Sequence, residues 1–106
     1  MNRKILVANW KLNPSTEKEA TKLAKAIDSK NVVICPPFPF LKAVGSVIKK
    51  AVLGAQNVFW EEGGAYTGEV SPYMLKNLGV EYVIIGHSER RRHLGETDEM
   101  INKKVK

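Results

Sequence analysis

The residue with the clearest chemical potential is a histidine that directly follows an apolar run. In the segment YVIIGHSERRR, Tyr82 to Ile85 lead into Gly86 and His87, and the chain has 2 histidines in all. Glycine lets the backbone turn sharply, and an imidazole placed there can donate or accept a proton near neutral pH. His87 is therefore a candidate catalytic group. The competing interpretation is a histidine that only bonds a neighbouring carbonyl.

The residues after His87 predict a short helical turn. We expect Ser88 to cap this turn, which then carries Glu89 and the arginines 90–92. Glu89 by itself is typical of an ordinary charge in a first helical turn. His93 lies beyond, and we expect it at the surface.

A second polar group follows the first apolar run of the chain. Asn9, Trp10 and Lys11 come directly after Ile5 to Ala8. Side chains alternate in an extended segment, so Asn9 and Lys11 point to one side and Trp10 to the other. The Lys11 ammonium can then bind a phosphate while Asn9 offers an amide. The alternative is that both are ordinary loop residues.

The elements that position these groups alternate between strand and helix. Short runs rich in Val and Ile predict buried strands over residues 5–8, 32–35, 52–56 and 82–85. Thr16 and Glu19 have capping-box spacing, and Ser71 with Pro72 is typical of a helix start. The helices are expected to begin near residues 16, 40, 71 and 97. We expect Lys49 and Lys50 in the last turn of the second helix, where cations suit the helix dipole.

This alternation predicts an α/β fold with a parallel sheet and right-handed crossovers, in a single domain over residues 1–106. In such folds the ligand lies outside the carboxyl ends of the strands, where Asn9, Lys11 and His87 all fall. The stretch NVFWEEGGAYTGEV is a long loop of a length that is usually functional.

Composition narrows the classes of partner. The chain has 106 residues, 43% hydrophobic and 26% charged, with a net charge of +6, which is an ordinary globular balance. The basic residues form no stripe interleaved with aromatics, so we expect no nucleic-acid partner. No apolar run is long enough for a membrane span or a signal peptide, and the single Cys35 has no internal disulfide partner. We therefore expect a reduced, cytoplasmic setting.

Three motifs taken together carry a family resemblance. ANWKLN near the start, GAQNV with GAYTGEVSP in the middle and IIGHSERRRHLGETDE near the end closely resemble triosephosphate isomerase in order and spacing. The likeness covers essentially the whole chain. It implies the N-terminal half of a (β/α)8 TIM barrel, four strands each followed by a helix with the last helix truncated. It also implies a glycolytic isomerase that acts on a phosphorylated triose without a metal or organic cofactor.

The resemblance also implies roles for particular residues. Asn9 and Lys11 would contact the substrate, with Lys11 at its phosphate end. In this family the corresponding histidine is a neutral imidazole that polarises the carbonyl and shuttles protons, and the resemblance implies this role for His87. The N-terminus of a helix pointing at the ring would keep it neutral. Ser88 and Glu89 would support this site. Tyr66, Thr67 and Gly68 would form a loop that contacts a neighbouring subunit.

The family's catalytic glutamate and its phosphate-binding glycine loops have no counterpart in this sequence. Glu69, Glu89 and Glu96 are carboxylates near the motifs, but nothing in the pattern places them against a substrate carbon. We therefore expect a split or truncated enzyme that needs a complementary C-terminal half-barrel chain, with little activity alone. The alternatives are a non-catalytic, self-associating half-barrel or engineered fragment, and a small binder of phosphorylated metabolites. Both as a split enzyme and as a self-associating half-barrel, the chain is not expected to be a stable monomer.

Overall fold

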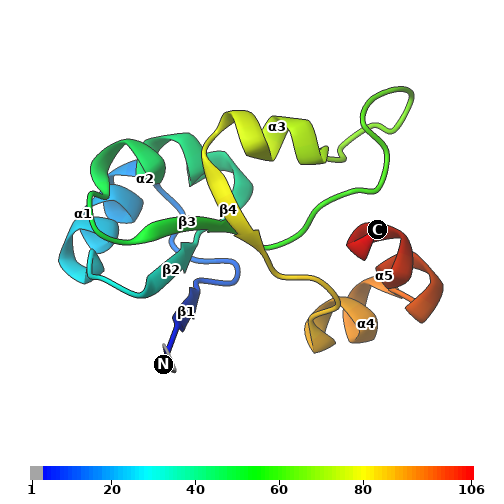
Figure 1. The fold of residues 1–106 in the computed structure, drawn as a ribbon, viewed down its shortest axis with the longest axis horizontal. Coiled ribbons are helices and arrows are strands. Elements are labelled where there is room, and N and C mark those ends of the chain that lie inside the picture. Colours follow the sequence, from blue (N-terminus) through cyan, green and yellow to red (C-terminus); the bar gives the residue numbers. More distant parts are fainter. Residues whose placement is uncertain (1–3) are drawn as a thin grey trace.

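The computed structural model describes residues 4–106 as an open parallel sheet with helices between its strands (Figure 1). The strand order is β1-β2-β3-β4, and each neighbouring pair is parallel. The strands are β1 (Leu6–Asn9), β2 (Val32–Cys35), β3 (Val52–Ala55) and β4 (Val80–Val83). The helices are α1 (Glu17–Ile27), a 3-10 turn η1 (Phe38–Phe40), α2 (Leu41–Val47), α3 (Pro72–Asn77), α4 (Ser88–Leu94) and α5 (Asp98–Val105). The predicted alternation and parallel sheet are confirmed, and the sheet is not closed.

Helix starts follow the predicted capping residues. The hydroxyl oxygen of Thr16 accepts a hydrogen bond from the backbone N–H of Glu19 at the start of α1. Ser71 and Thr97 accept equivalent bonds at the starts of α3 and α5. Each cap satisfies one of the backbone donors that a helix N-terminus leaves free.

The expected position of Lys49 and Lys50 in a helix is wrong, because α2 ends at Val47. Their backbone N–H groups instead donate to the carboxylate of Asp28, which follows α1, at 2.7 and 2.9 Å. The N–H of Ala51 donates to the same carboxylate at 2.7 Å. Asp28 therefore holds the turn before β3 against the end of α1, and this turn replaces the last helical turn.

Replacing Asp28 with Asn should destabilise the fold at neutral pH and much less in acid. Backbone N–H groups of Ala51 and Lys49 hold the pKa of the Asp28 carboxyl below its ordinary value of 3.8. A carboxyl whose folded-state pKa is lowered stabilises the fold above its unfolded-state pKa and loses this effect as pH falls through the folded-state pKa. Thermal unfolding should give a lower Tm for Asp28→Asn at pH 7, with the difference shrinking below about pH 4. Glu62→Gln, in the exposed loop, is the matched control. If Asp28→Asn lowered Tm equally at all pH values, the Asp28 carboxylate would not be what holds the turn before β3.

The last strand begins earlier than the sequence predicts. The expected strand 82–85 is observed at Val80–Val83, directly after Gly79, whose φ of 85° lets the chain turn out of α3. The N–H of Ile84 still donates to the carbonyl of Ala55 at 2.8 Å. Bonding to β3 therefore continues to Ile84, and the chain then runs through Ile85 and Gly86 to His87.

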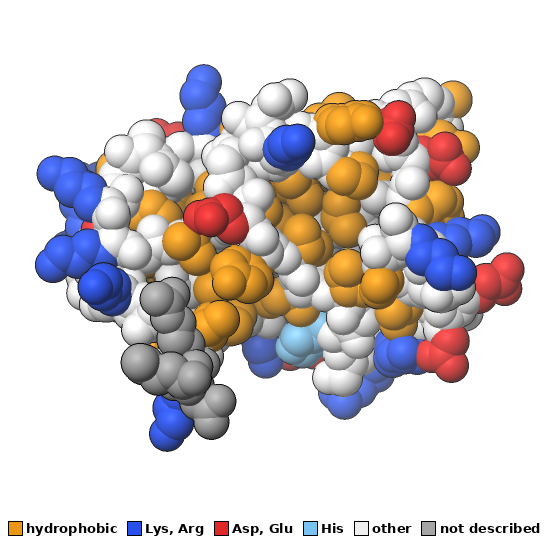
Figure 2. Space-filling view, viewed as in Figure 1, with side chains coloured by type: hydrophobic (Ala, Val, Ile, Leu, Met, Phe, Trp, Pro, Cys, Tyr) orange, Lys and Arg blue, Asp and Glu red, His pale blue; other side chains and the backbone are white. Residues whose placement is uncertain are grey.

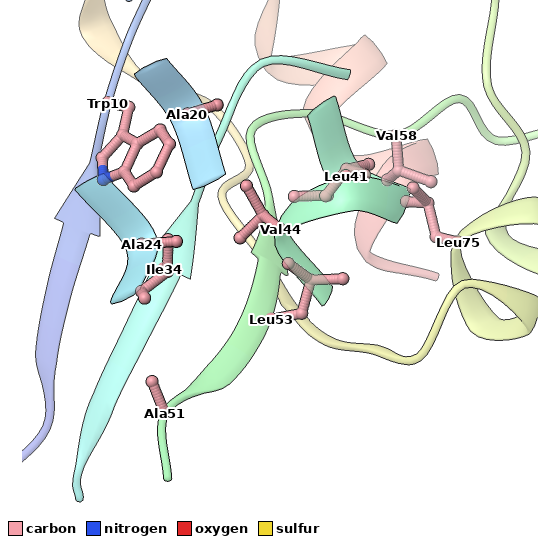
Figure 3. Packing of buried hydrophobic residues seen from close by; sticks show 11 residues of the cluster. Trp10, Ala20, Ala24, Ile34, Leu41, Val44, Ala51, Leu53, Val58 and Leu75 are labelled. Carbon is pink, nitrogen blue, oxygen red and sulfur yellow. The ribbon is translucent and has the colours of Figure 1, made fainter. Parts of the chain in front are cut away.

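One side of the sheet packs against α1, α2 and α3 and forms the core (Figure 3). Ile34 and Leu53 project from the middle strands, and Leu41 and Val44 meet them from α2, all at most 3% exposed. Trp10 packs in the same cluster, on the opposite side from Asn9 as predicted. The core therefore fixes the strand from which Asn9 and Lys11 emerge.

The outer strand β1 is apolar yet uncovered. Leu6 is 68% exposed and Val7 50%, although their side chains point to opposite sides of the sheet. On β4, Tyr82 is 47% exposed. Figure 2 shows hydrophobic side chains gathered across the middle of one face, with basic side chains at its edges. The Cα radius of gyration is 14.0 Å, against about 13 Å for a compact domain of this size.

The long loop between β3 and α3 is confirmed, and in Figure 1 it protrudes from the sheet. Phe59 stacks on Trp60 with ring centroids 4.2 Å apart and also contacts the ring of Tyr66. The loop is therefore organised by its own aromatic side chains. In the part of the chain that the structure describes, no helix has the length and apolar character to cross a membrane.

Candidate active site

The backbone at Lys11 is held in an unusual conformation by two amide side chains. Lys11 has a φ of 57°, in the left-handed region that a non-glycine residue seldom adopts. Its N–H donates to Oδ1 of Asn9 at 3.0 Å, and its carbonyl accepts from Nε2 of Gln56 at 2.8 Å. Strained residues of this kind cluster at functional sites when their surroundings hold them. The ends of β1 and β3 thus jointly position the lysine.

His87 stands at the start of α4 and caps that helix with its own ring. Nδ1 of His87 accepts a hydrogen bond from the backbone N–H of Glu89 at 3.1 Å. With Nδ1 as acceptor in this bond, Nε2 is the ring nitrogen left to donate to another group; Nδ1 also lies 3.8 Å from Oε2 of Glu89. The expectation that Ser88 caps this helix is wrong, because the side chain of His87 takes that position and Ser88 is the exposed first helical residue.

Lys11 and Glu89 join the two parts of the site. Nζ of Lys11 lies 2.6 Å from Oε1 of Glu89. The hydrogen bond from Lys11 holds the pKa of the Glu89 carboxyl below its ordinary value, against a smaller opposing effect of desolvation. A carboxylate in this state is a weak base, which agrees with leaving Glu89 out of the role of proton acceptor.

These groups line a cavity of about 280 Å³ at the carboxyl ends of the strands. Asn9, Lys11, His87 and Glu89 all line it, as do Gln56, Asn57 and Arg90. The side chain of His87 is 29% exposed and that of Lys11 is 54% exposed. The cavity therefore offers an ammonium, an amide and an imidazole to a small anionic ligand.

Other predicted residues lie outside this cavity. Tyr66, Thr67 and Gly68 are exposed in the long loop between β3 and α3. His93 is at the surface as expected. Among residues 4–106, no three His, Cys, Asp or Glu side chains are grouped so that they could hold a metal ion.

Gln56 is a site residue that the sequence reasoning did not single out. Its Nε2 donates to the carbonyls of both Lys11 and Cys35, at 2.8 and 2.9 Å. Two signals pointed to it: its place directly after β3, where an amide ends a strand as Asn9 does, and its position in the GAQNV motif. It joins β1, β2 and β3 at the edge of the cavity.

An open sheet of parallel strands alternating with helices, with its cavity at the carboxyl ends, is half of a (β/α)8 barrel, the class of enzyme fold whose active sites occupy that end. The family model described as triosephosphate isomerase matches residues 4–106. Curated triosephosphate isomerases from Dictyoglomus thermophilum, Thermoanaerobacter pseudethanolicus and Clostridium botulinum are 54%, 55% and 53% identical, over 100%, 99% and 100% of this chain. The chain belongs to the triosephosphate isomerase family.

The match covers only part of these relatives. The aligned region is 46%, 45% and 46% of the three proteins, so the chain spans about half of their length. The half that it spans carries the cavity lined by Asn9, Lys11 and His87.

Proposed function

We propose that this chain supplies the N-terminal half of a triosephosphate isomerase, which interconverts glyceraldehyde 3-phosphate and dihydroxyacetone phosphate. The observation that carries the proposal is the convergence of Asn9, Lys11 and His87 on one cavity in a chain of this family. No residue of the described chain is assigned as the base, which the remaining half of the barrel would provide.

The reaction gives each of these groups a task. The base removes a proton from the carbon beside the carbonyl, and the electron pair forms a carbon–carbon double bond while charge develops on the carbonyl oxygen. Nε2–H of His87 donates to that oxygen, where a preoriented donor lowers the barrier most. His87 then moves a proton between the two oxygens before the neighbouring carbon is reprotonated. Lys11 binds the phosphate end, with Asn9 beside it.

The uncovered strands support a partner that completes the barrel. Leu6 and Val7 are exposed on opposite sides of β1, although the sequence of this strand is typical of one buried on both faces. Within residues 4–106, β1 and β4 each pair with one neighbour, so each has a row of free backbone groups. We propose that a complementary C-terminal half occupies this edge and face, within the cytoplasm.

A second copy of the chain is the alternative occupant. The same exposed Leu6, Val7 and Tyr82 favour self-association of a non-catalytic half-barrel. Two copies that each carry a net charge of +6 repel one another, however, and this repulsion is strongest at low salt. A complementary half of negative net charge would face no such repulsion.

Titration of the purified chain with a chain that carries the missing half tests the proposal. We expect no triose phosphate isomerisation from the chain alone, and activity that rises to saturation near an equimolar ratio. Sedimentation velocity on the same mixtures should show a one-to-one complex. Activity absent at every ratio, with only homo-oligomers in the sedimentation profile, would contradict the proposal and favour the self-associating module.

The contact loop is a further part of the proposal. Tyr66, Thr67 and Gly68 are proposed to contact a neighbouring subunit of the assembled enzyme. Their support is the exposed, protruding position of the loop and the ordering of its base by Phe59 and Trp60.

A further inference from the structure

A buried ion-pair cluster lies directly behind the proposed site. The side chains of Glu96 and Lys104 are 1% and 2% exposed, and the ammonium of Lys104 contacts Oε2 of Glu96. The same oxygen accepts from Nε of Arg90 at 3.0 Å. Nζ of Lys104 also donates to Oδ1 of Asn57 at 2.8 Å. The other carboxylate oxygen of Glu96 is buried and has no hydrogen-bond partner in the described structure.

This cluster connects the sheet to both C-terminal helices. Asn57 follows β3, Arg90 belongs to α4, Lys104 belongs to α5, and Glu96 lies between the two helices. In Figure 1, α4 and α5 lie together and apart from the helices that cover the core. The bond between Lys104 and Asn57 therefore ties this helix pair to the end of β3.

The cluster also reaches the backbone of His87. The N–H of Arg90 donates to the carbonyl of His87 at 2.9 Å, so the residue that Glu96 holds is bonded to the histidine. Independently, Ile101 of α5 packs over Gly86, where an added Cβ would lie 3.0 Å from Cδ1 of Ile101. Helix α5 therefore packs directly on Gly86. It is also linked to the carbonyl of His87 through Glu96 and Arg90.

Buried ion pairs are seldom a large source of net stability. Apolar side chains of similar volume often replace them at little cost, because removing the charges from water offsets their attraction. Buried charged groups are better known for fixing one particular arrangement of packed helices or strands. Arg90 and Asn57 also line the cavity with His87, so the arrangement fixed here is that of the site.

We propose that Lys104 and Glu96 are positioning residues for His87, holding α4 so that the imidazole keeps its bond to the N–H of Glu89 and presents Nε2 to the cavity. The inference rests on the proposed function only for the task given to His87. The orientation of the ring is a property of this chain and is measured without catalysis.

The test is NMR of the full chain with labelled histidine and backbone nitrogen. The double variant Glu96→Gln/Lys104→Met removes both buried charges while keeping side-chain volume, and Lys104→Met is the single companion. In the unchanged chain, Nδ1 of His87 should show coupling across the hydrogen bond to the N–H of Glu89, with His93 as the exposed reference. The double variant should lose this coupling. Hydrogen exchange of the Glu89 amide should accelerate at least about tenfold relative to the amides of β2, as expected for local opening.

Asp98→Asn is the matched control, because Asp98 joins α5 to Arg91 of α4 at 2.7 Å on the surface, with the Asp98 side chain 90% exposed. It should leave the His87 signals unchanged. A double variant that folds and keeps both the coupling and the slow exchange at Glu89 would overturn the proposal. So would equal acceleration of Glu89 and β2 amides, which indicates a purely structural cluster. Loss of isomerase activity in the reconstitution test would leave these NMR results unaffected.

Discussion

Gly54→Ala should prevent the chain from folding, or destabilise it by about 3 kcal/mol or more, because overpacking a filled core costs about 1–3 kcal/mol and occasionally more. An added Cβ would lie 2.5 Å from Sγ of Cys35 and 2.8 Å from Cγ1 of Val33. Both neighbours are at most 2% exposed and sit on the adjacent strand. Neither can move away without displacing β2. Urea unfolding followed by circular dichroism measures the loss.

Gly63→Ala is the control for this change. A Cβ at Gly63 meets no atom within 4 Å, so its unfolding midpoint should match that of the unchanged chain. Cys35→Ala in the Gly54→Ala background removes the closer of the two clashes and should restore part of the stability. A Gly54→Ala chain with an unaltered midpoint would show that the strands do not pair as β2 and β3 do here.

His87→Ala should lower kcat of the reconstituted isomerase by a factor of about 10² to 10⁴, the usual contribution of a positioned acid–base group. The imidazole donates to the oxygen only as charge develops there, so KM should change little. Steady-state kinetics in both directions of the reaction, at saturating complementary half, give the two constants separately. Sedimentation of the same mixture shows whether the variant still forms the complex.

His93→Ala is the matched histidine control, because His93 is exposed on the same helix. It should retain full activity. Lys11→Met provides a contrast, since it removes a charge proposed to bind the phosphate end and should raise KM strongly. If His87→Ala retained its kcat while Lys11→Met lost activity, the chain would be a phosphate-binding half whose proton transfers lie elsewhere.

The sequence predicted the strands and helix starts well because both depend on local residues. Thr16, Ser71 and Thr97 cap their helices through bonds three residues away, and the apolar runs of β1 to β3 agree with the structure within one residue at each end. Local reasoning was wrong where a distant partner decides the backbone. The carboxylate of Asp28 ends α2 by taking amides that lie 21 to 23 residues away.

The site was predictable in part for the same reason. Asn9, Lys11 and His87 each follow an apolar strand, and the carboxyl ends of parallel strands meet at one edge. No local pattern shows that His87 itself caps α4 in place of Ser88. Nor does one show that Glu96 meets Asn57 through Lys104, since that contact spans 47 residues between Asn57 and Lys104. Such contacts appear only once the sheet has fixed the helices.

The uncovered strand β1 has a consequence for synthesis of the whole barrel. A ribosome extends a chain by about 5–20 residues per second, so a complete protein about twice this long would expose Leu6 and Val7 for on the order of ten seconds before the second half emerged. During that interval neighbouring nascent chains could pair edge to edge. The positive charge of this half, +6 over 106 residues, keeps such chains apart through mutual repulsion. The net charge of this half would then favour solubility during translation.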